Sequence, residues 1–413
     1  MKVAFVDPVV SPAYLGEQLA LCGFTTCAVY TLNALSDAQK KLRFRPDLFD
    51  HHIMVAEHDS MESVAVQLKQ WGAERVFYGY EGSVVFADQL AQLVCPEFAH
   101  DPASSLQRCN KYAMQEALRI AGLPFIPQIK ITGKQLTAEH RAALETFQFP
   151  VIVKPVNGSS SLGVKKCESM ADLDAWLTRE VDHLMIGRDV EEYVIQECVF
   201  GEEYLLDTVS IGGTHKLVGL QRYAKTYYQG SPICRFFGNI ERSSPEWDVC
   251  QDFIFAVLNA VQFREGMAHT EIFMTDAGPR LIEVNPRISG AYGFSNKLHQ
   301  LNFGFDQVSM LAQSFGLNLA GAFQDNMRAD YGRIVCLQNW QPRKMSPFNA
   351  ALLQQLSSYQ EHFVLKQPGT LLNTPQALSD TVAFVLLAHH NQDQLLEDYA
   401  QLMVWEEQGG VLF

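Results

Sequence analysis

Short apolar runs alternate with amphipathic segments over the first hundred residues. Runs rich in β-branched and aromatic residues, typical of buried strands, are KVAFVD (2–7), TTCAVYTL (25–32) and ERVFYGY (74–80). Segments with helical spacing lie between them at 14–23 and 61–72. This alternation predicts an α/β domain with a parallel, Rossmann-like sheet over residues 1–105. The first turn, VDPVVSPAYLG, lacks the GxGxxG pattern, so dinucleotide binding is not expected there.

The pattern changes from about residue 105. NKYAMQEALRIAGLP predicts an amphipathic helix that ends at Gly122 and Pro124. Strand-like segments follow at 149–155, 192–200, 204–210 and 216–223, and a helix around VLNAVQF precedes a hairpin pattern at 268–287. Mixed segments from about 320 onward suggest a smaller α+β unit. We therefore expect domains at 1–105, 106–319 and 320–413, with the second divided into 106–195 and 196–319.

Charge and cysteine content narrow the class of protein. The 413 residues include 32 Lys and Arg against 46 Asp and Glu, a net charge of −14, which argues against nucleic-acid and membrane partners. Nine cysteines show no CxxC spacing, as expected for reduced thiols. No signal segment and no apolar run of about 20 residues is visible. We expect a soluble, cytoplasmic protein.

A lysine followed by a Gly/Ser loop is the first candidate for chemistry. Lys154 ends the strand VIVKP, and Gly158–Gly163 follows as GSSSLG. This is not a P-loop, because Val164 stands where that motif has lysine. Backbone N–H groups and the hydroxyls of three residues could cover phosphate oxygens while Lys154 supplies charge: Ser159, Ser160 and Ser161. The alternative is an ordinary hairpin loop beside a solvated lysine.

The hairpin HTEIFMTDAGPRLIEVN allows its geometry to be predicted. Pairing about Ala277, in an Asp276–Gly278 turn, places Glu271 opposite Glu283 and His269 opposite Asn285 on one face. Ile272 and Ile282 would face each other on the other side. Opposed carboxylates with Cβ atoms about 5 Å apart repel unless a cation or a proton intervenes.

Carboxylate and amide oxygens suit Mg²⁺, so we expect Glu271, Glu283 and Asn285 to bind a metal. The alternative is a solvent-facing polar edge. His269 is either a catalytic or supporting residue of this site or a structural one. Arg287, two residues after Asn285, could clamp a phosphoryl group or a carboxylate, or form a surface ion pair.

Together, Lys154 with GSSSLG, QECVFGEE at 196–203 and EIFM…LIEVNPR at 271–287 resemble the ATP-grasp superfamily. The resemblance covers about residues 105–310 and implies an ATP-grasp fold, in which two α+β subdomains clamp ATP, behind the N-terminal Rossmann-like domain. GEEYLLDTVS and HTEIFMTDAGPRLIEVNPRISG more narrowly resemble L-amino-acid ligases of the bacilysin-synthetase type and carnosine synthase. Those enzymes join a carboxylate to an amine as ATP becomes ADP.

The resemblance also implies roles for individual residues. Lys111 and Lys154 would contact the ATP phosphates, Glu197 and Val199 would read adenine, and Glu203 would hold the ribose, with Glu202 as its rival. The metal set would be Glu271, Glu283 and Asn285, binding Mg²⁺ or Mn²⁺. Arg287 would stabilise an acyl phosphate, and Gly290 would lie in a loop whose backbone approaches the substrate.

Other substrate contacts are less defined. Glu81, in YGYEGSV after a predicted strand, lies where open sheets bind ligands and could bind an amine. It could equally be a helix N-terminal carboxylate. Arg222, Lys225 and Arg235 are further, unranked candidates.

These observations lead us to expect an ATP-dependent carboxylate–amine ligase that joins small substrates, amino acids above all, through an acyl phosphate. A homodimer is a reasonable expectation from the resemblance. The alternatives are a biotin-carboxylase-like or purine-pathway ligase, or a nucleotide-binding regulator without catalysis. The complete set of metal-site residues and Arg287 favours an active enzyme.

Overall fold

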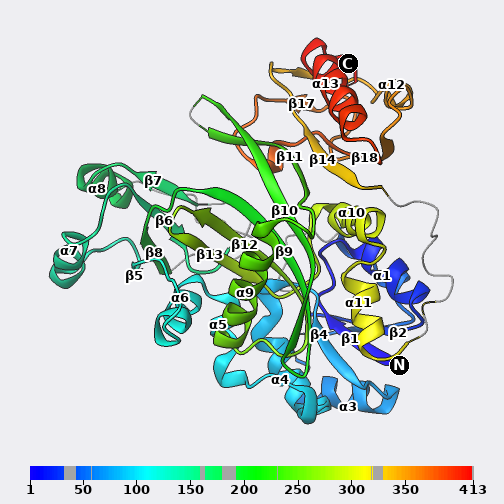
Figure 1. The fold of residues 1–413 in the computed structure, drawn as a ribbon. Helices are drawn as coiled ribbons and strands as arrows, with labels where there is room; N and C mark the ends of the chain where they lie inside the picture. Colours follow the sequence, from blue (N-terminus) through cyan, green and yellow to red (C-terminus); the bar gives the residue numbers. More distant parts are fainter. Residues whose placement is uncertain are drawn as a thin grey trace.

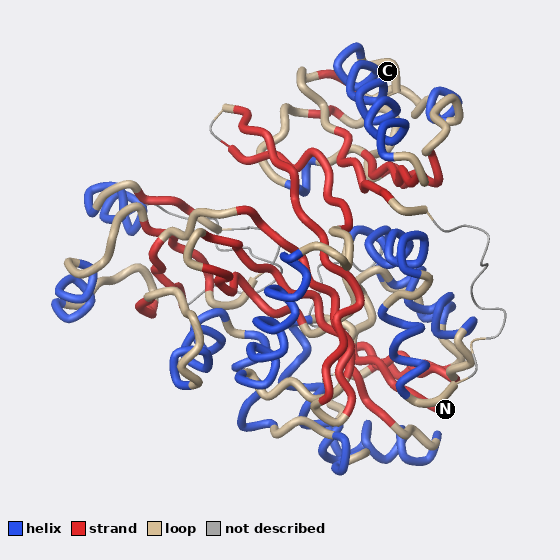
Figure 2. Tube along the Cα trace, in the orientation of Figure 1, coloured by secondary structure: helices blue, strands red, loops and turns tan. Residues whose placement is uncertain are grey.

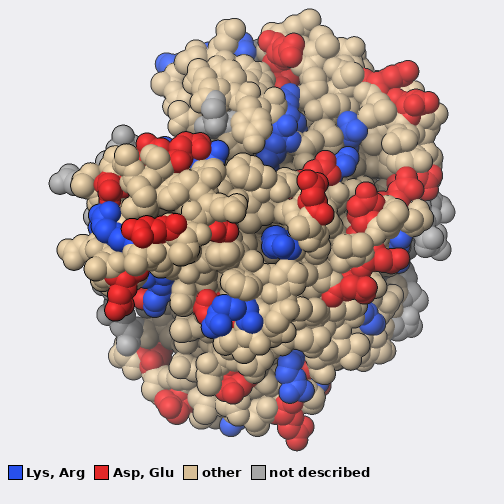
Figure 3. Space-filling model, turned by 60° about the vertical axis from the view of Figure 1, so that its left-hand side comes forward, with Lys and Arg blue, Asp and Glu red and all other residues tan. Residues whose placement is uncertain are grey.

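The computed structural model describes residues 1–31, 43–56, 58–158, 163–178, 192–229, 231–317, 319 and 329–411. Three main sheets organise these residues, with helices packed around them (Figures 1 and 2). None of the helices in this part of the chain combines the length and apolar character needed to cross a membrane. Acidic and basic side chains are interspersed over the face drawn in Figure 3.

The N-terminal sheet is parallel, as the alternation of strands and helices predicted. Its order is β3-β2-β1-β4. The strands are β1 (Lys2–Val6), β2 (Thr25–Tyr30), β3 (His51–Met54) and β4 (Arg75–Tyr78). The helices are α1 (Pro12–Leu21), α3 (Met61–Trp71) and α4 (Val84–Val94). The Ser60 side chain caps α3 by accepting from the Ser63 N–H, and Gly72 ends this helix with a φ of 88°.

A small antiparallel sheet follows, in the order β5-β8-β6-β7. Its strands are β5 (Gln128–Thr132), β6 (Val151–Pro155), β7 (Lys165–Cys167) and β8 (Glu192–Glu197). The helices of this region are α5 (Ser105–Cys109), α6 (Lys111–Ile120), α7 (Ala138–Leu144) and α8 (Met170–Thr178). Val151 and Val153 are fully buried in the core of this sheet, which fixes β6 and the lysine that follows Val153.

The largest sheet has eight strands, in the order β13-β12-β9-β10-β11-β14-β18-β16. Its first five along the chain are β9 (Glu202–Ile211), β10 (Thr214–Tyr228), β11 (Ser231–Asn239), β12 (Gly266–Thr275) and β13 (Gly278–Asn285). The last three are β14 (Tyr331–Leu337), β16 (Tyr359–Val364) and β18 (Ala383–His389). The helices α9 (Pro245–Ala260), α10 (Phe294–Phe303) and α11 (Gln307–Ser314) pack on it.

The remaining elements complete the C-terminal part and the connections. They are α12 (Ala350–Leu353), α13 (Gln392–Gln408), β15 (Arg343–Lys344) and β17 (Leu371–Leu372). Short 3-10 helices are η1 (Pro46–Leu48), η2 (Glu81–Ser83), η3 (Pro96–Phe98), η4 (Pro102–Ser104), η5 (Ala291–Gly293) and η7 (Leu378–Asp380). Because β14, β18 and β16 extend the large sheet, the C-terminal part continues the sheet that carries the predicted hairpin. The three domain limits given above stay predictions.

The β12–β13 hairpin has the predicted register at its functional end and a different one near its turn. Glu271 pairs with Glu283 and His269 with Asn285, as predicted. The pairing of Ile272 with Ile282 is wrong, because a bulge follows Glu271 and Ile272 pairs with Leu281. Only Asp276 and Ala277 form the turn, since Gly278 already belongs to β13. An extra residue in one strand re-aims its side chain, and Ile282 lines a cavity instead of facing away from it.

Candidate active site

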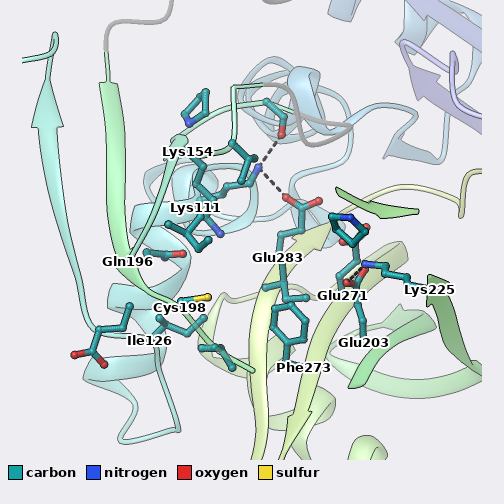
Figure 4. Close-up of a pocket in the computed structure, with 18 residues that line it drawn as sticks. Lys111, Ile126, Lys154, Gln196, Cys198, Glu203, Lys225, Glu271, Phe273 and Glu283 are labelled. Atoms are coloured by element: carbon teal, nitrogen blue, oxygen red, sulfur yellow. Dashed lines mark hydrogen bonds and ion pairs between the residues drawn. The ribbon is translucent and has the colours of Figure 1, made fainter. Parts of the chain in front are cut away.

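A cavity of about 340 Å³ lies between the small sheet and the β12–β13 hairpin. One wall comes from β6, β8 and the segment after β8, and the other comes from the hairpin (Figure 4). Lining residues that the argument below uses are Lys111, Lys154, Gln196, Glu197, Val199, Glu203, Lys225, Glu271, Phe273, Ile282 and Glu283. Apolar side chains thus occupy one part of the cavity and charged side chains the other.

Lys154 is the buried cation of this cavity. It ends β6, and only 8% of its surface is exposed. Burial, followed by the positive charge of Lys111, lowers the pKa of Lys154 to about 8. An anion placed between the two lysines would reverse this effect, so the site favours a negatively charged ligand.

Lys111 connects the two walls. It is the first residue of α6, where the Asn110 side chain accepts from the N–H groups of Tyr112 and Ala113. Its Nζ lies 2.7 Å from the Gly158 carbonyl oxygen and 2.7 Å from Glu283 Oε2 (Figure 4). This cap and these two contacts fix the ammonium group beside the hairpin.

The two facing carboxylates differ in charge. Burial, then the neighbouring Glu283 and Glu203, raises the pKa of Glu271 to about 8. For Glu283 burial acts in the same direction, but Lys111 and the Asn285 amide outweigh it and lower the pKa to about 2. Lys111 therefore neutralises Glu283, while Glu271 lacks a compensating cation close by.

The hairpin end fits a hard divalent cation. Asn285 Nδ2 donates to Glu283 Oε1 at 3.1 Å, so its amide lies beside the carboxylate pair. Two carboxylates and an amide oxygen form the donor set that Mg²⁺ prefers, and a cation would remove the repulsion that raises the pKa of Glu271. Within the described residues no group of three His, Cys, Asp or Glu side chains has metal-site geometry, because the third donor here is an amide.

His269 belongs to a buried cluster that the sequence did not reveal. Its Nδ1 lies 2.7 Å from Asp207 Oδ1, and its Nε2 lies 4.0 Å from Glu271 Oε1. His299 Nε2 contacts the other Asp207 oxygen at 2.8 Å. Although burial opposes it, the two imidazoles lower the pKa of Asp207 well below its ordinary value. A charged residue inside the apolar run YLLDTVS was the one signal of this cluster in the sequence.

Arg287 and Glu81 are brought together from distant parts of the chain. Arg287 Nε donates to Glu81 Oε2 at 2.9 Å, and the two side chains are 12% and 15% exposed. The alternative of a surface ion pair for Arg287 is therefore wrong, since the pair is largely buried. Glu81 also begins η2, so both of its predicted positions describe the same residue. The Gly290 carbonyl, three residues after Arg287, accepts from Ser11 Oγ at 3.2 Å.

The other candidates divide into those in the cavity and those outside it. Glu203 lines the cavity and pairs with Lys225, whereas Glu202 pairs with the exposed Arg222 at 3.3 Å. Arg235 pairs with Glu406 of α13, away from this cavity. Glu197 and Val199 lie on the cavity wall, and Glu197 Oε1 accepts from the Gln148 N–H at 3.0 Å.

Three candidates and two unpredicted residues complete the comparison with the sequence. Ser159, Ser160 and Ser161 lie outside the described residues. Phe273 and Ile282 contribute apolar surface to the cavity, and neither had been singled out for it. Phe273 shares a face with Glu271 through period-2 alternation, so the strand pattern could have identified it.

Comparisons with known proteins place the chain in a class. Residues 147–295 match the sequence model of the ATP-grasp domain. The chain belongs to the ATP-grasp superfamily of ligases and has its α/β architecture, as the motifs around Lys154 and Glu283 predicted.

Individual relatives narrow the similarity. The chain is 26% identical over 321 residues to dapdiamide A synthase of Enterobacter agglomerans, a match that covers 74% of this chain and 72% of the relative. It is 24% identical over 188 residues to D-alanine–D-alanine ligase of Corynebacterium urealyticum, covering 43% and 49%. In fold it is similar to an L-amino acid ligase from Bacillus licheniformis, with a TM-score of 0.71 and 16% identity over 98% of this chain and 97% of that one.

Proposed function

We propose that this chain is an ATP-dependent carboxylate–amine ligase that joins small substrates, amino acids among them, through an acyl phosphate and releases ADP and phosphate. The observation that carries the proposal is the juxtaposition of Lys111, Glu283 and Glu271 in the cavity, with Lys111 2.7 Å from Glu283. Its sequence relatives named above, a dapdiamide synthase and a D-alanine–D-alanine ligase, support this class of reaction.

The nucleotide would lie along the cavity from its apolar to its charged end. Adenine fits between the segment Gln196–Val199 and the side chains of Phe273 and Ile282, where backbone groups can read its edge. Glu203, rather than the outward-paired Glu202, would accept from the ribose hydroxyls. Lys111 and Lys154 would hold the phosphates, since each presents an ammonium group at the same end.

Glu271, Glu283 and Asn285 would hold Mg²⁺ or Mn²⁺. When bound, the ion neutralises charge on the triphosphate and on the transferring phosphoryl group. His269, held by Asp207, would orient the Glu271 carboxylate from behind. Lys111 would exchange its Glu283 contact for a phosphate oxygen, which leaves Glu283 available as a ligand.

The chemistry divides into two steps. A carboxylate oxygen of the acyl donor attacks the γ-phosphorus, and the bond to the bridging oxygen breaks with its electron pair to release ADP. Arg287 would hold this carboxylate and then stabilise the acyl phosphate. The amine nitrogen attacks the carbonyl carbon, the bond to the phosphate oxygen breaks with its electron pair, and the surplus proton of the nitrogen leaves with phosphate.

The test is a screen of amino-acid pairs for phosphate release, with the product mass read directly. Replacing the amine with hydroxylamine should trap the activated donor as a hydroxamate, with ADP formed in equal amount. Stoichiometric AMP and pyrophosphate would mean an adenylate intermediate and would contradict the proposed route.

A further inference from the structure

A second cavity of about 490 Å³ adjoins the first. The two cavities share Lys111, Gly158 and Glu283, so a molecule in the second can reach the phosphate end of the first. The other side of this second cavity is formed by η2 and α4 of the N-terminal region and by α5 and α6. We call it the amine chamber, for the reasons that follow.

The wall of the amine chamber is apolar over much of its area. Val85 and Phe86 of α4, Leu106 of α5 and Met114 of α6 all line it. Val85 is 41% exposed and Leu106 is 54% exposed, although both are apolar. Apolar surface that borders a cavity gains free energy when a ligand covers it, so these side chains favour an occupant with an apolar group.

The charges of the chamber select the other end of the occupant. Its charged lining residues, within the described part of the chain, are Glu81, Glu283 and Lys111. Lys111 is already held by Glu283 and by the Gly158 carbonyl. Glu81 lies at the opposite boundary, in contact with Arg287 at 2.9 Å. This lining attracts an ammonium group and disfavours an additional carboxylate in the apolar part.

We infer that the amine chamber binds the amine substrate of the proposed ligase, and that this amine carries an apolar side chain such as that of leucine, methionine or phenylalanine. The inference rests on the proposed function. The amino group lies toward Glu81, and the apolar side chain covers Val85, Phe86 and Leu106. From there the nitrogen reaches a carbonyl carbon held by Arg287, because Glu81 and Arg287 are in contact. Acceptors with an acidic side chain are poor substrates.

The variant Val85→Glu tests the chamber without touching the phosphate site. Val85 is the second residue of α4, where a carboxylate is compatible with the helix dipole. Val66→Glu is the matched control, since Val66 is 51% exposed on α3, outside the lining of the chamber. Unfolding midpoints of both variants check that each is folded, and Val85→Ala serves as a milder second variant.

Two measurements are made on each protein. Calorimetric titration of L-leucine into the protein with MgADP measures binding alone. Rates with L-leucine, L-phenylalanine, L-aspartate or hydroxylamine as the amine measure ligation. We expect Val85→Glu to weaken L-leucine binding about fivefold or more, and to lower kcat/KM for L-leucine by a similar factor relative to hydroxylamine on the same variant. Val66→Glu should leave both quantities at the parent value.

The outcomes separate this inference from the proposed function. Equal L-leucine binding by the parent and Val85→Glu, or faster ligation of L-aspartate than of L-leucine, overturns the chamber assignment while leaving ligase activity intact. Binding of L-leucine that depends on Val85, without amide formation from any acid, supports the chamber and overturns the proposed reaction.

Discussion

Glu283→Gln should remove most ligase activity while leaving the protein folded. The substitution deletes one of two facing carboxylates and leaves Lys111 without its counter-ion at 2.7 Å. Both side chains of this pair are largely buried, at 13% and 14% exposed, so solvent screens the loss only weakly. Loss of one group that stabilises charge in a closed site costs about 3–4 kcal/mol of transition-state stabilisation, or about 10²–10³-fold in rate.

The matched control is Glu202→Gln, the same chemical change outside the cavity. Glu202 and its partner Arg222 lie 3.3 Å apart with side chains 61% and 50% exposed, so this pair contributes less than about 1 kcal/mol. ADP release is measured for both variants over a Mg²⁺ titration. We expect Glu283→Gln to lower kcat and to require more Mg²⁺, and Glu202→Gln to behave as the parent. Near-normal turnover of Glu283→Gln at low Mg²⁺ would refute the metal assignment.

Two further predictions concern stability. Because the pKa of Glu271 is raised from 4.5 to about 8, the folded protein retains a proton that the unfolded chain loses, and this group makes stability fall as pH rises from about 4.5 to about 8. The slope is at most about 1.4 kcal/mol per pH unit; urea unfolding without Mg²⁺ should show it in the parent and not in Glu271→Gln, and equal slopes would contradict the assignment. Gly219→Ala should destabilise by about 2 kcal/mol, because a Cβ there would lie 2.0 Å from His299 Cε1 and displace the ring from Asp207. Gly410→Ala, whose Cβ would meet its nearest neighbour at 3.5 Å, is the control, and equal unfolding midpoints would show that the His299 cluster tolerates displacement.

Local patterns carried much of the fold and part of the site. The alternation of apolar runs and helices predicted the parallel N-terminal sheet, because each element buries one face and so shows its period in the sequence. The opposition of Glu271 and Glu283 followed from period-2 alternation about a tight turn. The same rule failed one residue later, because a bulge depends on what the hairpin packs against and leaves no mark in the period of either strand.

Contacts between distant segments could not be read from spacing. Arg287 and Glu81 were both identified, yet their contact joins residues 206 positions apart. Asp207 and His299 were missed because one lies in a strand and the other in a helix, 92 positions away. The continuation of the large sheet into β14, β18 and β16 was also missed, since a strand pattern does not specify its neighbour.

The net charge of −14 illustrates how global and local electrostatics differ in this protein. An acidic surface argues against long polyanions, whose binding needs many cations at the surface. The cavity needs only Lys111 and Lys154, because attraction between charges is stronger where water is excluded. Burial also lowers the pKa of Lys154, so the empty cavity disfavours its own positive charge. A bound phosphate chain would restore that charge, and the free energy regained adds to the affinity for nucleotide. The same acidic chain can therefore reject nucleic acid and still bind a small polyphosphate.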